Sequence, residues 1–399
     1  MYSHFKLFQR QPIIFCNVLD LSTNKEAVTG EEIALSGKQA KLPFDAILSS
    51  LVVKSASSSE SPLVKDTDYA AYYSDGSLIV ETIEGGAAKD ATKLFISYDK
   101  VKTTEIGDDD IVKGIEAIDL CMATVSITPD LIIAPGWSHT STVQAVMAAK
   151  AEVINGILGA KSICDIDCSA SGARSYDAVA AKKSATNLID PAQIAAWPQV
   201  KLGNKQFHLS TQLAGLMAKV DSGNDGVPYE SPSNKNLQCD GACLEDGTAI
   251  TLTLEQANIL NANGICTALR FMNGWVAWGD YTACYPSNTD IKDYYIPISR
   301  MFKWVGNSLI KTFWSKTDSP MNRRLLDNIK DSANNWLAGL VGSEYLLGAR
   351  VEILDSENPM TDLMAGIVRI HIYMTPPSPA QEIDFILEYD TDYVQSALA

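Results

Sequence analysis

Residues 131–158 read LIIAPGWSHTSTVQAVMAAKAEVINGIL, and this stretch decides the class of fold. Its first four residues form a short apolar run, which is typical of a buried strand. A helix is predicted over 141–158, because Ser141 or Thr142 can cap its start and Gly159 follows its end. Apolar residues recur through it at helical spacing, at Val143, Val146, Met147, Ile154 and Ile157. The stretch therefore predicts a strand that leads directly into a helix.

The same alternation of strand and helix continues along the chain. A second strand is predicted over 162–166, and further helices are predicted over 209–219 and 254–262. Alternation of this kind favours an α/β layer with a largely parallel sheet. We expect this layer to form a core domain over 104–290.

On the N-terminal side of the core, the pattern changes to short strands. Residues 30–103 contain several apolar runs separated by turn signals, which predicts a small β-sandwich domain. Before it, residues 11–21 (QPIIFCNVLDL) form an apolar run rich in β-branched residues, which predicts one buried strand. Residues 1–29 are therefore expected to hold an N-terminal arm and the first strand of the core.

The C-terminal part, residues 291–399, is expected to be an α+β domain. Helical patterns come first, and two strand-like runs follow over 366–374 and 382–389, separated by the rigid segment 375–379 (TPPSP). The last run carries apolar Ile383, Phe385 and Leu387 at alternate positions. Such a terminal strand can dock in its own sheet, which is the commoner arrangement, or complete the sheet of a neighbouring chain.

The charge of the chain limits its partners. Lys and Arg number 32 and Asp and Glu number 48, which gives a net charge of −16 and argues against general affinity for nucleic acid or anionic lipid. Residues 299–330 depart from this balance, with seven basic and two acidic residues. A basic face on an acidic body suggests an acidic partner, and the alternative is a solvated helix face. Since the sequence has no long apolar run and no signal-peptide pattern, we expect neither membrane insertion nor export.

The eight cysteines include two pairs with a C-x3-C spacing, Cys164/Cys168 and Cys239/Cys243. Structural zinc sites more often use a two-residue spacing, and no His-x3–5-His pair follows. Free thiols in a reducing compartment are therefore favoured over a zinc site.

An α/β hydrolase is the alternative function. Ser138 and His139 follow one predicted strand, and Asp165 and Asp167 follow or end another. A catalytic triad needs three groups that converge from separate loops, whereas Ser138 and His139 are adjacent and the sequence has no G-x-S-x-G elbow. Phosphate-binding motifs do not occur either. We therefore expect no catalytic residue, no metal and no cofactor.

Several short segments resemble, in their order and spacing, the contractile-tail sheath protein family. The resemblance covers most of the chain, from about residue 63 to residue 389. The segments that carry it are 66–69 (DTDY), 131–139 (LIIAPGWSH), 231–235 (SPSNK) followed by Gly241, 260–265 (LNANGI), 273–275 (NGW) with Trp278-Gly279, Asn358-Pro359, Gly366 and Pro376-Pro377.

This resemblance implies a structural protein and no enzyme. The implied fold is an α/β core of subtilisin-like topology without a protease site, an inserted β-sandwich and a C-terminal domain that faces an inner tube. Family members stack as hexameric rings, and extended terminal arms join the sheets of neighbouring subunits. In this sequence the usual longer N-terminal arm is shortened to Met1–Arg10.

The resemblance also implies the partners and the place of work. Other copies of the chain, a tail tube protein, and baseplate and tail terminator proteins are the expected partners, in a virion tail assembled in the host bacterial cytoplasm. The expected inter-subunit arm strand carries Ile383, Phe385, Leu387 and Tyr389. The basic residues expected to face the tube are Arg300, Lys303, Arg323, Arg324 and Lys330.

Overall fold

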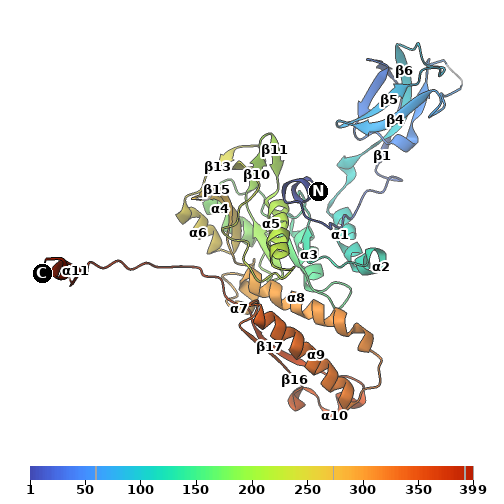
Figure 1. Cartoon of the computed structure of the whole chain (residues 1–399). Coiled ribbons are helices and arrows are strands. Elements are labelled where there is room, and N and C mark those ends of the chain that lie inside the picture. Colours follow the sequence, from blue (N-terminus) through green and yellow to red (C-terminus); the bar gives the residue numbers. More distant parts are fainter. Residues whose placement is uncertain (59–60, 273, 391, 399) are drawn as a thin grey trace. The chain divides into compact units, whose positions relative to one another are not determined.

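The computed structural model describes residues 1–58, 61–272, 274–390 and 392–398 (Figure 1). Asn273, one of the residues that carry the family resemblance, lies outside the described residues. The chain divides into two compact units: residues 17–114 form one, and residues 1–16 together with 115–399 form the other. Each unit is described by itself.

The unit of residues 17–114 contains two three-stranded antiparallel sheets, with strand orders β1-β6-β3 and β2-β5-β4. Burial alternates along β6, where Leu94, Ile96 and Tyr98 point into a shared hydrophobic cluster. Leu42 and Leu78 join this cluster from the other sheet. The strands are β1 (Lys25–Ala34), β2 (Gln39–Pro43), β3 (Val52–Lys54), β4 (Tyr69–Ser74), β5 (Ser77–Thr82) and β6 (Lys93–Val101).

The larger unit is built on a five-stranded sheet of order β15-β14-β9-β8-β7. Four strands are parallel, as the strand-helix alternation predicted, and the fifth, β15, is antiparallel to β14. The strands are β7 (Leu131–Ile133), β8 (Lys161–Asp165), β9 (Gln193–Ala196), β14 (Ile265–Phe271) and β15 (Gly274–Trp278). β8 and β9 are buried along their whole length, which places them in the centre of the core.

Helices and a small second sheet complete this core. The predicted helix over 141–158 ends earlier than expected, because Asn155 and Gly156 adopt positive φ values in a tight turn. Its N-cap is Thr140. The helices are α2 (Cys121–Val125), α3 (Ser141–Glu152), α4 (Tyr176–Ala185), α5 (Leu209–Gly223) and α6 (Leu254–Asn261), while α1 (Asp108–Glu116) spans the boundary between the two units. The second sheet has the order β11 (Lys205–Phe207), β10 (Gln199–Leu202), β12 (Gly241–Cys243) and β13 (Ala249–Ile250).

The C-terminal part packs two long helices with a two-stranded sheet. Met301 and Val305 of α8 and Leu337 of α9 meet Val351 of β16 in one hydrophobic cluster. β16 and β17 pair in antiparallel fashion. The elements are α7 (Ile291–Tyr294), α8 (Ile296–Phe313), α9 (Arg323–Gly342), β16 (Gly348–Glu352), α10 (Met360–Met364), β17 (His371–Thr375) and α11 (Asp392–Leu398). Among the described residues, no helix has the length and apolarity needed to cross a bilayer.

The prediction of a buried strand over residues 11–21 is wrong. The structure, which describes all of these residues, gives them no regular secondary structure before a turn at Leu21, and Phe15 is 68% exposed. A run of apolar residues becomes a strand only where a neighbouring strand offers its backbone, and none pairs with this segment in the described chain.

Residues 1–10 do not form the extended arm that the family resemblance implied. Ser3–Leu7 form a helical turn, and Ser3 Oγ donates a hydrogen bond to the Thr211 carbonyl of α5 at 3.3 Å. Phe8 is buried against Gly215 of the same helix. A Cβ atom at position 215 would lie 2.4 Å from Phe8 Cδ2, so the glycine makes room for the ring.

Candidate assembly surfaces

The most conspicuous unpartnered surface is a segment that we name the C-terminal arm, residues 382–389. The sequence pattern predicts a strand over 382–389, but in the structure, which describes each of these residues, they form none and pair with no sheet (Figure 1). The apolar side chains are open to solvent: Ile383 is 71%, Phe385 85%, Leu387 94% and Tyr389 78% exposed. Docking in the chain's own sheet is therefore not the arrangement found, and so much exposed apolar surface indicates an interaction site.

A strand donated by another copy needs a sheet edge with free backbone groups. At β15 the edge is covered, because Asn234 donates to the Ala277 carbonyl at 2.7 Å and Leu237 donates to the Trp275 carbonyl at 3.0 Å. At β16 the Asn334 side chain accepts a hydrogen bond from Val351 N at 2.8 Å. By contrast, in the part of the chain that the structure describes, β17 pairs only with β16 and keeps its other edge open.

Two of the five predicted basic residues are used inside the chain. Arg300 is 6% exposed and makes a two-point ion pair with Asp221 of α5. Lys303 Nζ lies 2.5 Å from Glu152 Oε2 at the end of α3. Arg300 is therefore not part of an exposed basic face, because its guanidinium group is buried against the Asp221 carboxylate.

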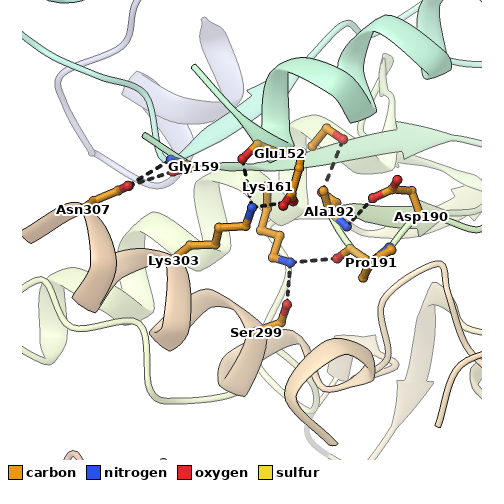
Figure 2. Close-up of polar contacts among 10 residues, drawn as sticks. Glu152, Gly159, Lys161, Asp190, Pro191, Ala192, Ser299, Lys303 and Asn307 are labelled. Atoms are coloured by element: carbon orange, nitrogen blue, oxygen red, sulfur yellow. Dashed lines mark hydrogen bonds and ion pairs between the residues drawn. The ribbon is translucent and has the colours of Figure 1, made fainter. Parts of the chain in front are cut away.

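The Lys303–Glu152 pair belongs to a polar junction that fixes α8 to the core (Figure 2). Ser299, Lys303 and Asn307 follow one another at four-residue spacing on one face of α8. Asn307 exchanges two hydrogen bonds with the backbone of Gly159, at 2.9 and 2.7 Å. Lys161 Nζ of β8 donates to Ser299 Oγ at 2.5 Å and to the Pro191 carbonyl at 2.7 Å. Burial lowers the pKa of Lys161 to about 7.

The other three basic residues lie on α9. Arg323 is exposed, and its Nε lies 3.6 Å from Asp327 Oδ2 on the next turn of the helix. Arg324 is also exposed. Lys330 is half-buried. Arg323 and Lys330 line one shallow groove, but Asp327, Glu352 and Asp355 line it too. The groove therefore carries mixed charge.

The residues of the hydrolase alternative do not form a triad. Ser138 Oγ donates to Asp165 Oδ2 at 3.3 Å, but Ser138 is fully buried. His208 Nδ1 lies 3.7 Å from Asp165 Oδ2. The imidazole near this carboxylate therefore belongs to His208 and not to His139, the histidine that the sequence pattern had suggested. Ser210 Oγ and N both donate to the same carboxylate, so Asp165 serves to hold the start of α5. Asp167 instead forms an ion pair with Lys182.

The cysteines give no metal centre in the described parts of the chain. Neither C-x3-C pair gathers with other His, Cys, Asp or Glu side chains into a group of three that could hold an ion. Cys164, Cys168 and Cys243 are buried, and burial raises the pKa of each thiol.

The chain is similar to known sheath proteins, although no family model matches it. It is 25% identical to the tail sheath protein of Burkholderia phage BcepMu over 404 aligned positions, which cover 96% of this chain and 82% of that protein. A chain of the anti-feeding prophage baseplate matches 69% of this chain and 73% of its own length, with a TM-score of 0.56 and 20% identity. A chain of the PVC sheath complex of an extracellular contractile injection system, in the contracted state, covers 72% and 82% with a TM-score of 0.55 and 18% identity.

The structural matches show the shared fold, and the sequence match extends over nearly the whole chain. The exposed C-terminal arm adds a surface that the chain itself leaves uncovered. The comparisons support the contractile tail sheath family for this chain, which confirms the predicted resemblance. Its homologues are structural tail sheath proteins and not enzymes.

Proposed function

We propose that this chain is the repeating subunit of a contractile tail sheath. It polymerises as stacked hexameric rings around an inner tail tube and contracts to drive the tube through a bacterial envelope. The observation that carries the proposal is the C-terminal arm, whose apolar side chains are exposed in a chain that matches a tail sheath protein over 96% of its length.

The arm joins subunits by adding a strand to a sheet of another copy. The open edge of β17 is the acceptor that the hydrogen bonds favour, because Asn334 occupies the edge of β16 and residues 234–237 cover β15. Backbone pairing supplies directional bonds, while alternate side chains such as Phe385 and Leu387 bury against the acceptor. The exposed apolar surface of the free arm is covered in this way.

Contraction moves each larger unit as one body. Four ties fix α8 to the core, from Ser299, Arg300, Lys303 and Asn307. With α8 held in this manner, movement between subunits falls to the C-terminal arm, the segment that joins them. Contraction draws on the difference in packing between the two assembled states, so the mechanism requires no nucleotide.

The tube contact is assigned to Arg323 and Arg324, with Lys330 beside them. Exposed ion pairs contribute only about 0–1 kcal/mol each, but a helical assembly repeats them many times. Weak repeated contacts suit a tube that must be released. Baseplate and terminator proteins are the partners at the two ends of the sheath, which places the protein in a virion or tail-like particle assembled in the host bacterial cytoplasm.

Electron microscopy of the purified protein tests this function. We expect rings or striated tubes with sixfold symmetry in projection. A protein that stays monomeric at every concentration, with and without its cognate tube, would contradict the proposal.

A further inference from the structure

Asp280 is a buried carboxylate held by side chains from distant parts of the chain. It is 1% exposed. Ser231 Oγ donates to Oδ1 at 2.5 Å, and Gln381 Nε2 donates to Oδ2 at 3.1 Å. Among the described residues, Gln381 is the hydrogen-bond partner of Oδ2. The residue just before the C-terminal arm therefore completes the hydrogen bonding of a buried acidic group.

The loop that carries Asp280 is fixed without help from the arm. Asp280 N donates to Asn261 Oδ1 at 3.0 Å, and Gly279 N donates to Ser233 Oγ at 3.1 Å. Gly279 has a φ of +125°, and a Cβ atom there would lie 2.9 Å from the Cα of Cys266. The loop is thus packed tightly against β14, and the carboxylate is already in position when Gln381 reaches it.

The environment of the chain changes at Gln381. On its N-terminal side β17 ends at Thr375 and Pro376 is buried. On its C-terminal side Ile383 is 71% exposed, and residues 382–389, all of them described, make no hydrogen bond to the rest of the described chain. Gln381 is therefore the last tie before the free segment.

We propose that Asp280 and Gln381 form an anchor that holds the base of the C-terminal arm on its own subunit, so that the segment taken up by a second copy begins at Glu382. The role of this anchor in assembly rests on the proposed sheath function, but the anchor itself does not. A fixed base sets where the donated strand starts, and eight extended residues, 382–389, then span at most about 26–29 Å. This one contact therefore defines both the register and the reach of the donated strand.

Limited proteolysis of the monomeric protein tests the anchor. A glutamate-specific protease cuts after Glu382 and after Glu388, and it must bind several residues before each cut in an extended form. The anchor should protect the first bond and leave the second unaffected, so the second serves as an internal control. In Gln381→Ala and Asp280→Ala we expect the rate after Glu382, relative to Glu388, to rise about fivefold, the factor that corresponds to losing one ordinary hydrogen bond.

Two controls make the result decisive. Asp280→Ala leaves the cleaved sequence unchanged, and a synthetic peptide of residues 376–390 with and without Gln381→Ala corrects for the preference of the protease. Asp280→Asn, which keeps polar partners for Gln381, should stay near the wild-type ratio. An unchanged ratio in Gln381→Ala after the peptide correction would overturn the anchor, whether or not Asp280→Ala folds. Failure to form tubes with the protection intact would instead count against the sheath function alone.

Discussion

Arg300 Nη1 lies 3.0 Å from Asp221 Oδ1 and Nη2 lies 2.5 Å from Asp221 Oδ2, so α8 and α5 are joined by a two-point ion pair. The guanidinium is buried, and Asp130, whose pKa is raised mainly by burial, lies near it. Arg300 therefore works as an internal tie between the helical C-terminal part and the core.

Arg300→Ala should lower the free energy of unfolding by about 3–5 kcal/mol, because it leaves the Asp221 carboxylate, which is only 17% exposed, without its partner. Urea denaturation measures this change. The matched control is Arg324→Ala on the exposed face of α9, which should cost less than about 0.5 kcal/mol. Equal effects of the two substitutions would show that the buried pair is not a structural tie.

Asp280 makes stability depend on pH in a specific direction. Burial raises its pKa from 3.8 to about 7, so in this range the folded protein holds a proton that the unfolded chain has released. The contribution of Asp280 to stability is therefore fully present below about pH 4 and is lost as the pH rises to about 7. Its ionisable neighbours Tyr281, Tyr295 and Cys266 have raised pKa values and stay neutral there.

Asp280→Asn should remove this loss. Relative to the wild type, we expect the variant to gain stability between pH 4 and pH 7, by an amount on the order of 4 kcal/mol. Denaturation curves of both proteins across this range provide the measurement, and the difference between them cancels the titration of other carboxylates. A difference that does not change with pH would mean that Asp280 titrates normally.

The N-terminal helical turn should depend on the space at Gly215. Gly215→Val places side-chain atoms where Phe8 packs, and we expect a loss of about 1–3 kcal/mol together with release of residues 1–8 to proteolysis. Adding Phe8→Ala to the Gly215→Val variant should recover part of the lost stability, because the smaller side chain leaves room for the valine. If the double variant is as destabilised as the sum of the two single variants, the clash is not the cause.

Reversal of Arg323 and Arg324 to Glu tests the tube contact. Self-assembly of the sheath should persist, since neither residue lies on the arm, while co-sedimentation with the cognate tube should fall. Wild-type binding should also weaken as salt rises, because exposed charges are screened. Charge-reversed protein that binds the tube as well as the wild type, at low and high salt, would assign these residues to the solvated surface.

The elements with strong local patterns could be predicted from the sequence. The helices over 209–219 and 254–262 and the strands at 131–134 and 162–166 all occur, with ends shifted by a few residues. β9 was missed because its four residues, Gln193–Ala196, are too short to show a period and are buried only by the sheet around them. The run over 11–21 shows the opposite error, since its apolar residues find no strand to pair with in the described chain.

The same distinction between local patterns and contacts set by the fold applies to the assembly surfaces. The alternation of Ile383, Phe385 and Leu387 after the proline-rich segment predicted a terminal strand and left two arrangements open, and only the structure shows these residues unpaired and exposed. The roles of Arg300 and Asp280 could not, because each depends on a partner 79 or 101 residues away in sequence. A charged residue shows its type in the sequence, but burial and pairing are set by the fold.

Truncation after Gln381 tests the central claim most directly. It keeps the Asp280 anchor and removes the C-terminal arm, and a matched truncation after Asp390 keeps both. Negative-stain electron microscopy should show tubes for the wild type and for the longer truncation, and only folded monomers for the shorter one. Tubes of normal length from the chain that ends at Gln381 would contradict the account.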